Sequence, residues 1–424
     1  MESLKFLTLL AVYVTLATLD HVSGGGPLRS VVNALGVAMP LIMLGHFHSQ
    51  GIRLIIPTGF GIFYGIFVAA LLASYVVVGM YNFADLTKSL LAPVFAILGY
   101  NATAFDRQDP QAYAAMRRIG LFLLLLPIGY AVSRGWTTEA GQEVGIFANR
   151  NNAALYIVVL SNILFLMGGG VVVIVAALTV VALVFETLGV LVAVVAALLV
   201  SLSFRRYLPA YLLAALLGAF MLLGPIELPI GERLQRLAES IQSVTELGLW
   251  TSLADLSYAD LYVITGQNTD LSMFFRIKHW EDLIYAWTSH GWVPMVFGLG
   301  TGSAPFHTDI GLVPHNDYVR FLVEAGPLGL VGFAGITGWL LWSIGRRALL
   351  ISTATVTIYF FSENLVSNFA AMALYYWFGG YWARHANEPE PEEQLVDELD
   401  DEVTENLADD MNPPDAGLGI LDKG

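Results

Sequence analysis

Long apolar stretches separated by short polar connections recur along most of the chain. With their flanks, twelve of them approach the roughly 17–25 residues that a membrane-spanning helix needs. Runs such as VVVIVAALTVVALVF lack the period-two alternation of a transmembrane barrel strand, so we predict helices and not a barrel. The predicted helices cover residues 4–19, 31–44, 60–80, 86–105, 120–132, 155–167, 171–185, 188–202, 207–223, 319–344, 349–361 and 369–382.

This pattern predicts an all-α polytopic membrane protein with about twelve transmembrane helices and four parts. Residues 1–224 hold helices 1–9, and residues 225–317 form one large external loop between helices 9 and 10. Residues 318–386 hold helices 10–12, and residues 387–424 form an acidic cytoplasmic tail. The loop contains GERLQRLAESIQSVTEL and the aromatic-rich DLSMFFRIKHWEDLIYAWTSHGW, both with helical patterning. We therefore expect a small folded cap over the outer membrane face.

The composition agrees with a membrane body that carries a soluble tail. The chain is 56% hydrophobic and 13% charged, whereas soluble domains carry about 25% charged residues. Of the net charge of −15, residues 388–424 contribute −13, from fourteen acids and one lysine. We expect this tail to be disordered. The first apolar run lacks a clear cleavage site and is interpreted as a retained helix. Cysteine is absent from the sequence, which excludes disulfides and thiol catalysis.

Orientation follows from Lys and Arg in the short connections, because cytoplasmic loops are richer in these residues. With the N-terminus inside, ten such residues lie inside and four outside, so both termini are predicted to be cytoplasmic. The inside set is Lys5, Arg53, Arg107, Arg117, Arg118, Arg205, Arg206, Arg346, Arg347 and Arg384, and the outside set is Arg29, Lys88, Arg134 and Arg150.

Polar residues gather where the large loop meets the tenth helix, in PHNDYVRFLVEAGPLGL. A neutral His315 can remove a proton from an attacking hydroxyl, and Asn316 or Asp317 can cap the helix that follows. Upstream, Arg276 can hold a diphosphate. Glycines in FGLGTGS, including Gly300 and Gly302, allow positive φ and close approach of the backbone to a phosphate. These groups suit transfer of a group away from a diphosphate.

A purely structural interpretation of the same residues stays open. Pro-His-Asn before a helix can simply be a turn and a cap, and Arg320 and Glu324 have the i,i+4 spacing of a local ion pair. Glu324 nevertheless lies one to two turns into a predicted membrane helix, where a carboxylate is costly.

A second polar cluster, GIFANRNNAALY, includes Asn149 and Arg150 at the outer end of the sixth helix; helix capping is the alternative there. Arg205 and Arg206 are predicted to be inside and to determine topology. Glu186 is predicted at the outer end of the seventh helix, as an interfacial carboxylate or a wall of the same external cavity. The histidines lack ligand spacing such as HExxH, so we predict no catalytic metal.

Taken together, these motifs resemble the O-antigen ligase and O-antigen polymerase superfamily of membrane glycosyltransferases. The family has a His-Asn pair after a large periplasmic loop, followed by an acid and glycines, as in PHNDYVRFLVEAGPLGL. It also has an arginine and a tryptophan one turn apart before a glycine-rich stretch, here Arg276, Trp280 and FGLGTG. GIFANRNNAAL resembles the family's Gly-x-Phe-x-Asn-x-Asn. The resemblance covers residues 145–333; elsewhere it rests on helix number.

The resemblance implies metal-independent, inverting transfer of a polyprenyl-diphosphate-linked glycan to an acceptor hydroxyl, without a cofactor. His315 would be the base or would position the acceptor, Asn316 would cap or orient the histidine loop, and Glu324 is a further candidate for the catalytic set. Arg276 would bind the diphosphate, with help from Arg150 and Asn149, and Trp280 would contact the sugar or the lipid. Expected partners are the lipid bilayer, an acceptor glycan or lipid A core, and a chain-length regulator, with no nucleic acid. The implied location is the bacterial inner membrane.

The chain departs from the family pattern at one point. Many members carry Ser-Arg-Gly at the outer end of the seventh helix, where this chain has ETLGVLVA, with Leu188 in place of the arginine. Arg150, where the family often has proline, is our candidate for the missing charge. The departure favours a polymerase slightly over a ligase. The alternatives from other classes are a glycolipid transporter or flippase and a non-catalytic membrane scaffold.

Overall fold

The computed structural model describes residues 2–23, 27–106, 110–133, 144, 147, 149–169, 171–185, 187, 189–190, 193–194, 229–251, 255–264, 272–308, 311–344, 349–361 and 368–387. Over these residues the regular structure is helical, with isolated bridges at Met80–Thr301 and Val144–Phe147. The elements are α1 (Glu2–Val22), α2 (Pro27–Ser49), α3 (Thr58–Val77), α4 (Phe83–Leu91), α5 (Val94–Asp106), α6 (Pro110–Ser133), α7 (Arg150–Leu164), η1 (Phe165–Gly169), α8 (Val171–Val180), η2 (Val181–Phe185), α11 (Pro229–Glu246), η3 (Leu249–Thr251), α12 (Tyr258–Ile264), α13 (Ser272–Ser289), α14 (Trp292–Phe297), η5 (Ala304–Phe306), α15 (Asp317–Ile344), α16 (Leu349–Tyr359) and α17 (Phe369–Asn387).

Seven stretches within the described residues are long and apolar enough to cross a membrane, as in a multi-pass membrane protein. The helices predicted at residues 171–185, 349–361 and 369–382 are present as α8 with η2, α16 and α17, but they are not among the seven. The predicted helices at 188–202 and 207–223 lie largely outside the described residues, as does the tail beyond Asn387. The seven are Glu2–Val22, Leu28–Ser49, Thr58–Val77, Phe83–Thr103, Gln111–Ser133, Arg150–Met167 and Asp317–Ile344.

The helix predicted over residues 86–105 is present as the candidate membrane-crossing stretch Phe83–Thr103, which consists of α4 and α5 with an interruption between them. α4 ends at Leu91 and α5 starts at Val94, with Pro93 between them. Proline has no N–H to donate and its ring clashes with the carbonyl four residues earlier, which explains the break.

α15 also departs from the single continuous helix predicted over residues 319–344. Gly326 has φ 73° and ψ −176°, and Pro327 follows it. In a straight helix the 15 residues from Tyr318 to Phe333 would rise about 22 Å, yet the two ring centroids are 5.4 Å apart. A Cβ built on Gly329 would lie 2.9 Å from the Phe321 carbonyl oxygen, although these residues are eight apart. α15 therefore folds back on itself, with a first segment at residues 317–325 and a second segment at residues 327–344.

Glycines allow the helices to pack closely. The second segment of α15 runs along α3, where a Cβ on Gly332 would lie 2.6 Å from the Phe67 backbone. α17 crosses α5 in the same way, because a Cβ on Gly99 would lie 1.9 Å from the Trp377 carbonyl oxygen. Small residues at helix contacts are typical of membrane bundles. Phe6 of α1 stacks on Trp377, with ring centroids 4.2 Å apart.

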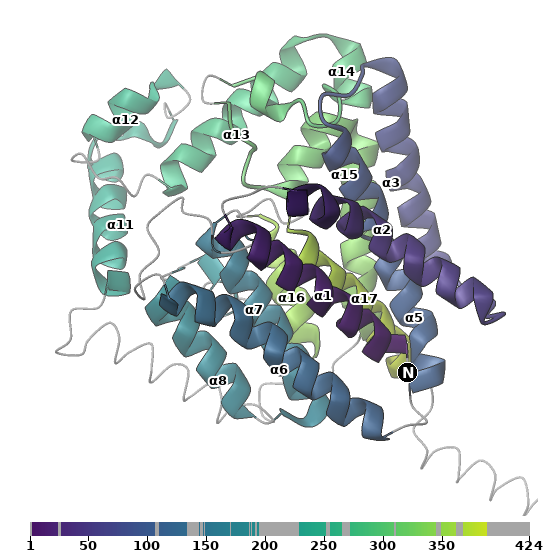
Figure 1. Ribbon diagram of the computed structural model, residues 1–424. Coiled ribbons are helices and arrows are strands. Elements are labelled where there is room, and N and C mark those ends of the chain that lie inside the picture. Colours follow the sequence, from purple (N-terminus) through teal and green to yellow (C-terminus); the bar gives the residue numbers. More distant parts are fainter. Residues whose placement is uncertain are drawn as a thin grey trace, which may run out of the picture.

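Hydrogen bonds identify the two ends of the bundle. At one end, Trp377 donates to the Ser3 hydroxyl at 2.9 Å, and the Ser3 amide donates to Asp106 at 3.0 Å. At the other end, the Asn368 side chain, before α17, donates to the carbonyl oxygen of Asn152 in the first turn of α7 at 2.9 Å. The start of α1 and the end of α17 thus lie at the same end. In Figure 1 the N-terminus is at the lower right and α12–α14 lie along the top.

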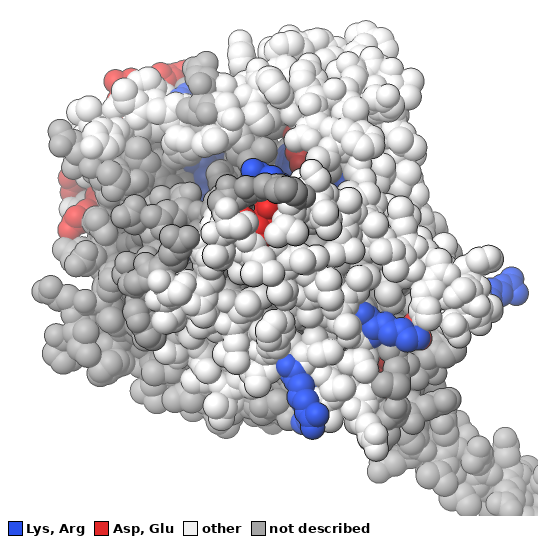
Figure 2. Space-filling model, in the orientation of Figure 1, with Lys and Arg blue, Asp and Glu red and all other residues white. Residues whose placement is uncertain are grey.

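The predicted external loop contributes α11, α12, α13 and α14 to the described structure, and the two helices predicted there are confirmed as α11 and α13. None of the candidate membrane-crossing stretches in the described residues falls in this loop. Among the described residues on the face shown in Figure 2, most are white, and blue and red atoms appear in a hollow in its upper middle as well as at its edges.

Candidate active site

The predicted site begins in the loop that leads into α15. The Asn316 side chain accepts a hydrogen bond from the Val319 amide at 3.0 Å, and the Asn316 carbonyl oxygen accepts one from Arg320 at 2.9 Å. Of the two N-cap candidates that the sequence offered, Asn316 is therefore the cap, and Asp317 is the first helical residue. His315, just before it, has φ 48° and is the one described non-glycine residue with a positive φ. Such a conformation costs on the order of 1–3 kcal/mol and persists only where the surroundings impose it.

α13 supplies the contacts that hold this loop. The Trp280 indole nitrogen donates to the Pro314 carbonyl oxygen at 2.5 Å, directly before His315. The neighbouring His279 Nε2 lies 3.0 Å from the carbonyl oxygen of Leu312. Because a carbonyl only accepts, His279 must carry its proton on Nε2. Two adjacent residues of one helix thus hold the strained loop.

Arg276 lies one helical turn before Trp280, so both side chains lie on the same side of α13. It is half-buried, as is His315. Trp280 thus contacts the loop that carries His315, and Arg276 lies on the same side of α13 as Trp280. A guanidinium can bind an anionic leaving group, and an imidazole can accept a proton.

His279 contacts the same loop but was not among the predicted site residues, because the histidines were weighed as metal ligands. Burial lowers its pKa, and the nearby His315 lowers it further, whereas the hydrogen bond to Leu312 acts in the opposite direction. Its Nδ1 is buried without a hydrogen-bond partner in the described part of the chain. The neutral form is therefore favoured. Its position next to Trp280 in the sequence could have indicated that His279 contacts the same loop.

The glycine stretch, residues 297–303, has the positive φ values that the sequence predicted. Gly298, Gly300 and Gly302 have φ of 83°, 101° and 77°. A Cβ would lie 2.3 Å from the Glu324 backbone at Gly298, 2.9 Å from the Gly79 carbonyl oxygen at Gly300, and 2.6 Å from the Asn82 Cβ at Gly302. The stretch thus fits tightly between α15 and the connection from α3 to α4.

The amides of these glycines donate within the protein. Gly300 donates to the Glu324 carbonyl oxygen at 3.2 Å, and Gly302 donates to the Glu324 side chain at 2.9 Å. The Val323 carbonyl oxygen likewise accepts a hydrogen bond, from the Leu299 amide at 2.7 Å. The break in α15 explains why the Glu324 and Val323 carbonyl oxygens accept from the glycine stretch and not from within the helix. Pro327 cannot donate to Val323 as a helix would require.

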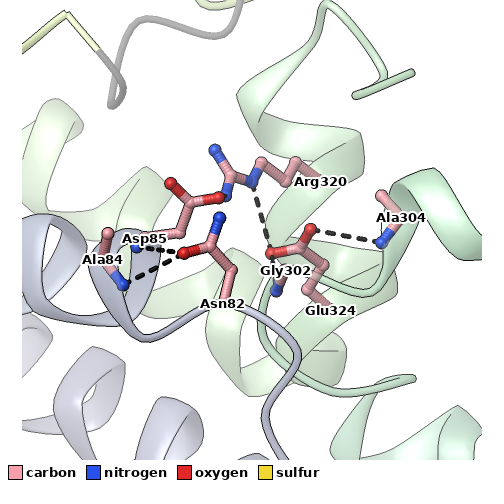
Figure 3. Close-up of polar contacts among 7 residues, drawn as sticks. All are labelled: Asn82, Ala84, Asp85, Gly302, Ala304, Arg320 and Glu324. Atoms are coloured by element: carbon pink, nitrogen blue, oxygen red, sulfur yellow. Dashed lines mark hydrogen bonds and ion pairs between the residues drawn. The ribbon is translucent and has the colours of Figure 1, made fainter. Parts of the chain in front are cut away.

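Behind the glycine stretch lies a buried group of charges, the Asp85–Arg320–Glu324 cluster (Figure 3). Arg320 Nη2 is 2.8 Å from Asp85 Oδ2, and Arg320 Nε is 3.2 Å from Glu324 Oε2. Arg320 and Glu324 are each 1% exposed. The i,i+4 ion pair predicted from the sequence is confirmed, whereas the second ion pair of Arg320, with Asp85, was not predicted. The sequence did carry a sign of a helix start with an acid in its first turn, the stretch Asn-Phe-Ala-Asp before an apolar run. In the structure Asn82 caps α4 there, by accepting hydrogen bonds from the Ala84 and Asp85 amides.

Glu324 also accepts from the Ala304 amide at 3.4 Å, so both of its carboxylate oxygens have donors inside the protein. Buried charges are costly unless they are paired and hydrogen-bonded, and these contacts meet that requirement. The geometry makes Glu324 a residue that fastens the glycine stretch to α15.

The depth of the site differs from the prediction. The sequence placed the polar cluster at the outer rim, at the mouth of a helix. Instead, the first segment of α15 starts beside Phe333, whose ring is 6.0 Å from Phe67 in the middle of α3. It ends near Ser74, in the last turn of α3, whose hydroxyl donates to the Glu324 carbonyl oxygen at 2.7 Å. The start of α15 is therefore sunk into the bundle, because the chain reverses at Gly326.

The second predicted cluster forms the start of α7. Asn149 is its N-cap, accepting from the Asn152 amide at 2.9 Å, and Arg150 is buried as the first helical residue. This start is joined to α17 through Asn368, and the start of α15 is joined to α16 by the Asp317 amide, which donates to the Phe360 carbonyl oxygen at 2.8 Å. The two predicted polar clusters thus lie at the starts of α7 and α15. These starts are hydrogen-bonded to α17 and α16, which contact each other. Glu186, Leu188, Arg205 and Arg206 lie outside the described residues.

Within the described ranges, no group of three or more His, Asp or Glu side chains is placed to hold a metal ion. No protein-family model matches the chain, and no curated protein matches it significantly. The resemblance to O-antigen ligases and polymerases therefore stays a prediction that rests on the motifs themselves.

Proposed function

We propose that this protein is a membrane glycosyltransferase that moves a glycan from a polyprenyl diphosphate to an acceptor hydroxyl. The observation that carries the proposal is His315, held at positive φ at the start of α15 by Trp280 and its neighbour His279. A strained histidine fixed beside an arginine-bearing helix is more than a turn requires, and strain of this kind concentrates at functional sites.

In the proposed reaction the acceptor oxygen forms a bond to the anomeric carbon while the bond to the diphosphate oxygen breaks. His315 takes the acceptor proton, and Arg276, supported by Arg150, balances the charge on the departing lipid diphosphate. Asn316 orients the histidine loop, and Glu324 positions the glycine stretch. Attack from the side opposite the leaving group inverts the anomeric centre, and the reaction uses no metal or cofactor.

The twelve-helix topology with cytoplasmic termini belongs to the same proposal, as does a place in the bacterial inner membrane. The acceptor is a second lipid-linked glycan for a polymerase, or lipid A core for a ligase. We favour the polymerase because Leu188 replaces the family arginine. A chain-length regulator is the protein partner that such a polymerase would use.

The test is complementation of a knockout strain, read as a glycan ladder on a gel. We expect His315→Ala to abolish the ladder while the protein accumulates normally. His48→Ala is the matched control. His48 is exposed in the last turn of α2 and is not part of the candidate site. A normal ladder with His315→Ala would remove the catalytic assignment.

One observation favours a second candidate, a glycolipid transporter. Transporters place buried charges beside broken helices within the membrane, and the Asp85–Arg320–Glu324 cluster lies at the break in α15. The two candidates separate in detergent, where no compartments exist. Glycan transfer by purified protein, surviving EDTA, supports the transferase. Movement of labelled glycolipid across vesicles without bond formation supports the transporter.

A further inference from the structure

A groove of about 400 Å³ lies between the second segment of α15 and α16. Leu330, Ala334 and Gly338 form a stripe at i, i+4 and i+8 along one wall, and Thr357 and Phe361 form the other. Its volume lies within the range of sites that bind small molecules. Almost all of its lining is apolar, so its ligand must be apolar too.

Tyr318 connects this groove to the candidate site. Its ring lines the groove, lies 4.4 Å from the Phe361 ring between centroids, and its hydroxyl donates to the Thr357 carbonyl oxygen at 3.1 Å. Tyr318 is also the third residue after His315. Because α15 folds back at Gly326, the groove and the histidine loop lie at similar depth in the bundle.

The groove is open beside the backbone of Gly338. This residue is exposed, and a Cβ built on it would meet no atom within 4 Å. A chain in the groove would pass along this bare backbone.

We propose that this groove binds the isoprenoid chain of the donor lipid, which deepens the proposed function and rests on it. The diphosphate would lie by His315 and Arg276, and the chain would pass Tyr318 and run along the Leu330–Gly338 stripe. Tyr318 lines the groove and follows His315 by three residues, which is the argument for the donor's own chain in preference to a bulk phospholipid. Such binding aligns the anomeric carbon with the base before the acceptor arrives.

The test is photo-crosslinking of purified protein in detergent with a polyprenyl diphosphate that carries a diazirine in its isoprenoid chain. We expect cross-links within residues 330–341 and 354–361, mapped by mass spectrometry. Gly338→Leu fills the groove and should remove them. Gly65→Leu is the matched control, since Gly65 of α3 is also helical, exposed and free of neighbours within 4 Å.

Cross-links on α3 instead, or an unchanged pattern in Gly338→Leu, would overturn the proposal. Equal labelling of the groove by a diazirine phosphatidylcholine would also overturn it, by making the groove a general lipid site. The cross-link does not need turnover, so it can fail while transfer succeeds, or succeed while transfer fails. With an active enzyme, Gly338→Leu should raise KM for long-chain donors but not for a two-isoprene donor, leaving kcat unchanged.

Discussion

The Glu324 carboxylate joins the first segment of α15 to the glycine stretch. It accepts hydrogen bonds from Arg320 and from the Gly302 and Ala304 amides. Glu324→Ala would leave a buried guanidinium with one partner and two amides with none. We expect a loss of about 3–5 kcal/mol in the free energy of unfolding, as when one member of a buried ion pair is removed. The measurement is unfolding in detergent micelles.

Glu281→Ala is the control for that substitution, because Glu281 is exposed on α13. Its effect should stay within about 0.5 kcal/mol. A Glu324→Ala protein as stable as the wild type would show that the cluster contributes little to the fold, contrary to its burial.

Gly302 tests the fit of the glycine stretch. Alanine there meets two obstacles, a φ of 77° and an Asn82 Cβ only 2.6 Å away. We expect Gly302→Ala to lower the melting temperature and abolish transfer, because the stretch must move away from α4. Gly338→Ala enters open space within a helix and should be neutral or stabilising by up to about 1 kcal/mol. Equal melting temperatures for the two variants would contradict the packing described above.

His279 predicts a pH dependence of the histidine loop. Its pKa in the folded protein is lowered by burial, so the unfolded chain binds more protons just below its ordinary pKa of about 6.5. Stability therefore rises with pH through this region and is fully present above about 6.5. The wild type should lose more melting temperature between pH 7.5 and pH 5.5 than His279→Gln, which keeps a donor for Leu312 but does not titrate. Equal losses would argue against a titrating His279.

Substitutions of Asn316, at the start of α15, can distinguish a capping role from a catalytic role for this residue. Its side chain accepts from the Val319 amide, and loss of such a cap costs about 1 kcal/mol. We expect Asn316→Ala to lower both stability and transfer, and Asn316→Ser, which keeps the cap, to restore both. Normal stability with lost transfer in the serine variant would assign Asn316 a direct part in the reaction. Thermal unfolding and the in vitro transfer rate are the two measurements.

The positions of the helices could be predicted from the sequence because apolar runs directly reflect burial in lipid or protein. The cap at Asn316 and the positive φ of the glycines could also be predicted, since both are local. The reversal at Gly326 could not, because Gly-Pro within an apolar run is compatible with a mild kink. It was this reversal that moved the site from the rim into the bundle.

Asp85 could not be predicted as a partner of Arg320 for a different reason. The two residues are 235 positions apart, and apolar periodicity does not say which helices are neighbours. The contact depends on the break between α3 and α4 facing the fold-back in α15. Long-range pairing of this kind is decided by packing, where small residues such as Gly332 set which backbones can approach.

The arrangement of the bundle predicts which parts of the protein share a compartment. The end of α2 lies beside the start of α1, where His46 Nε2 is 2.9 Å from Lys5 Nζ. α13, in the predicted external loop, lies at the opposite end, near the start of α15 (Figure 1). Since the sequence has no cysteine, single cysteines can report on each end without background. We expect Glu281→Cys to react with a membrane-impermeant maleimide added to intact spheroplasts, and Gln50→Cys to react only after lysis.

Both residues are exposed, so poor access cannot explain a difference between them. Labelling of Gln50→Cys alone in intact cells would invert the proposed orientation and place the candidate site on the cytoplasmic side, where a periplasmic transferase could not work. Labelling of both would mean that the two ends are not separated by a membrane at all.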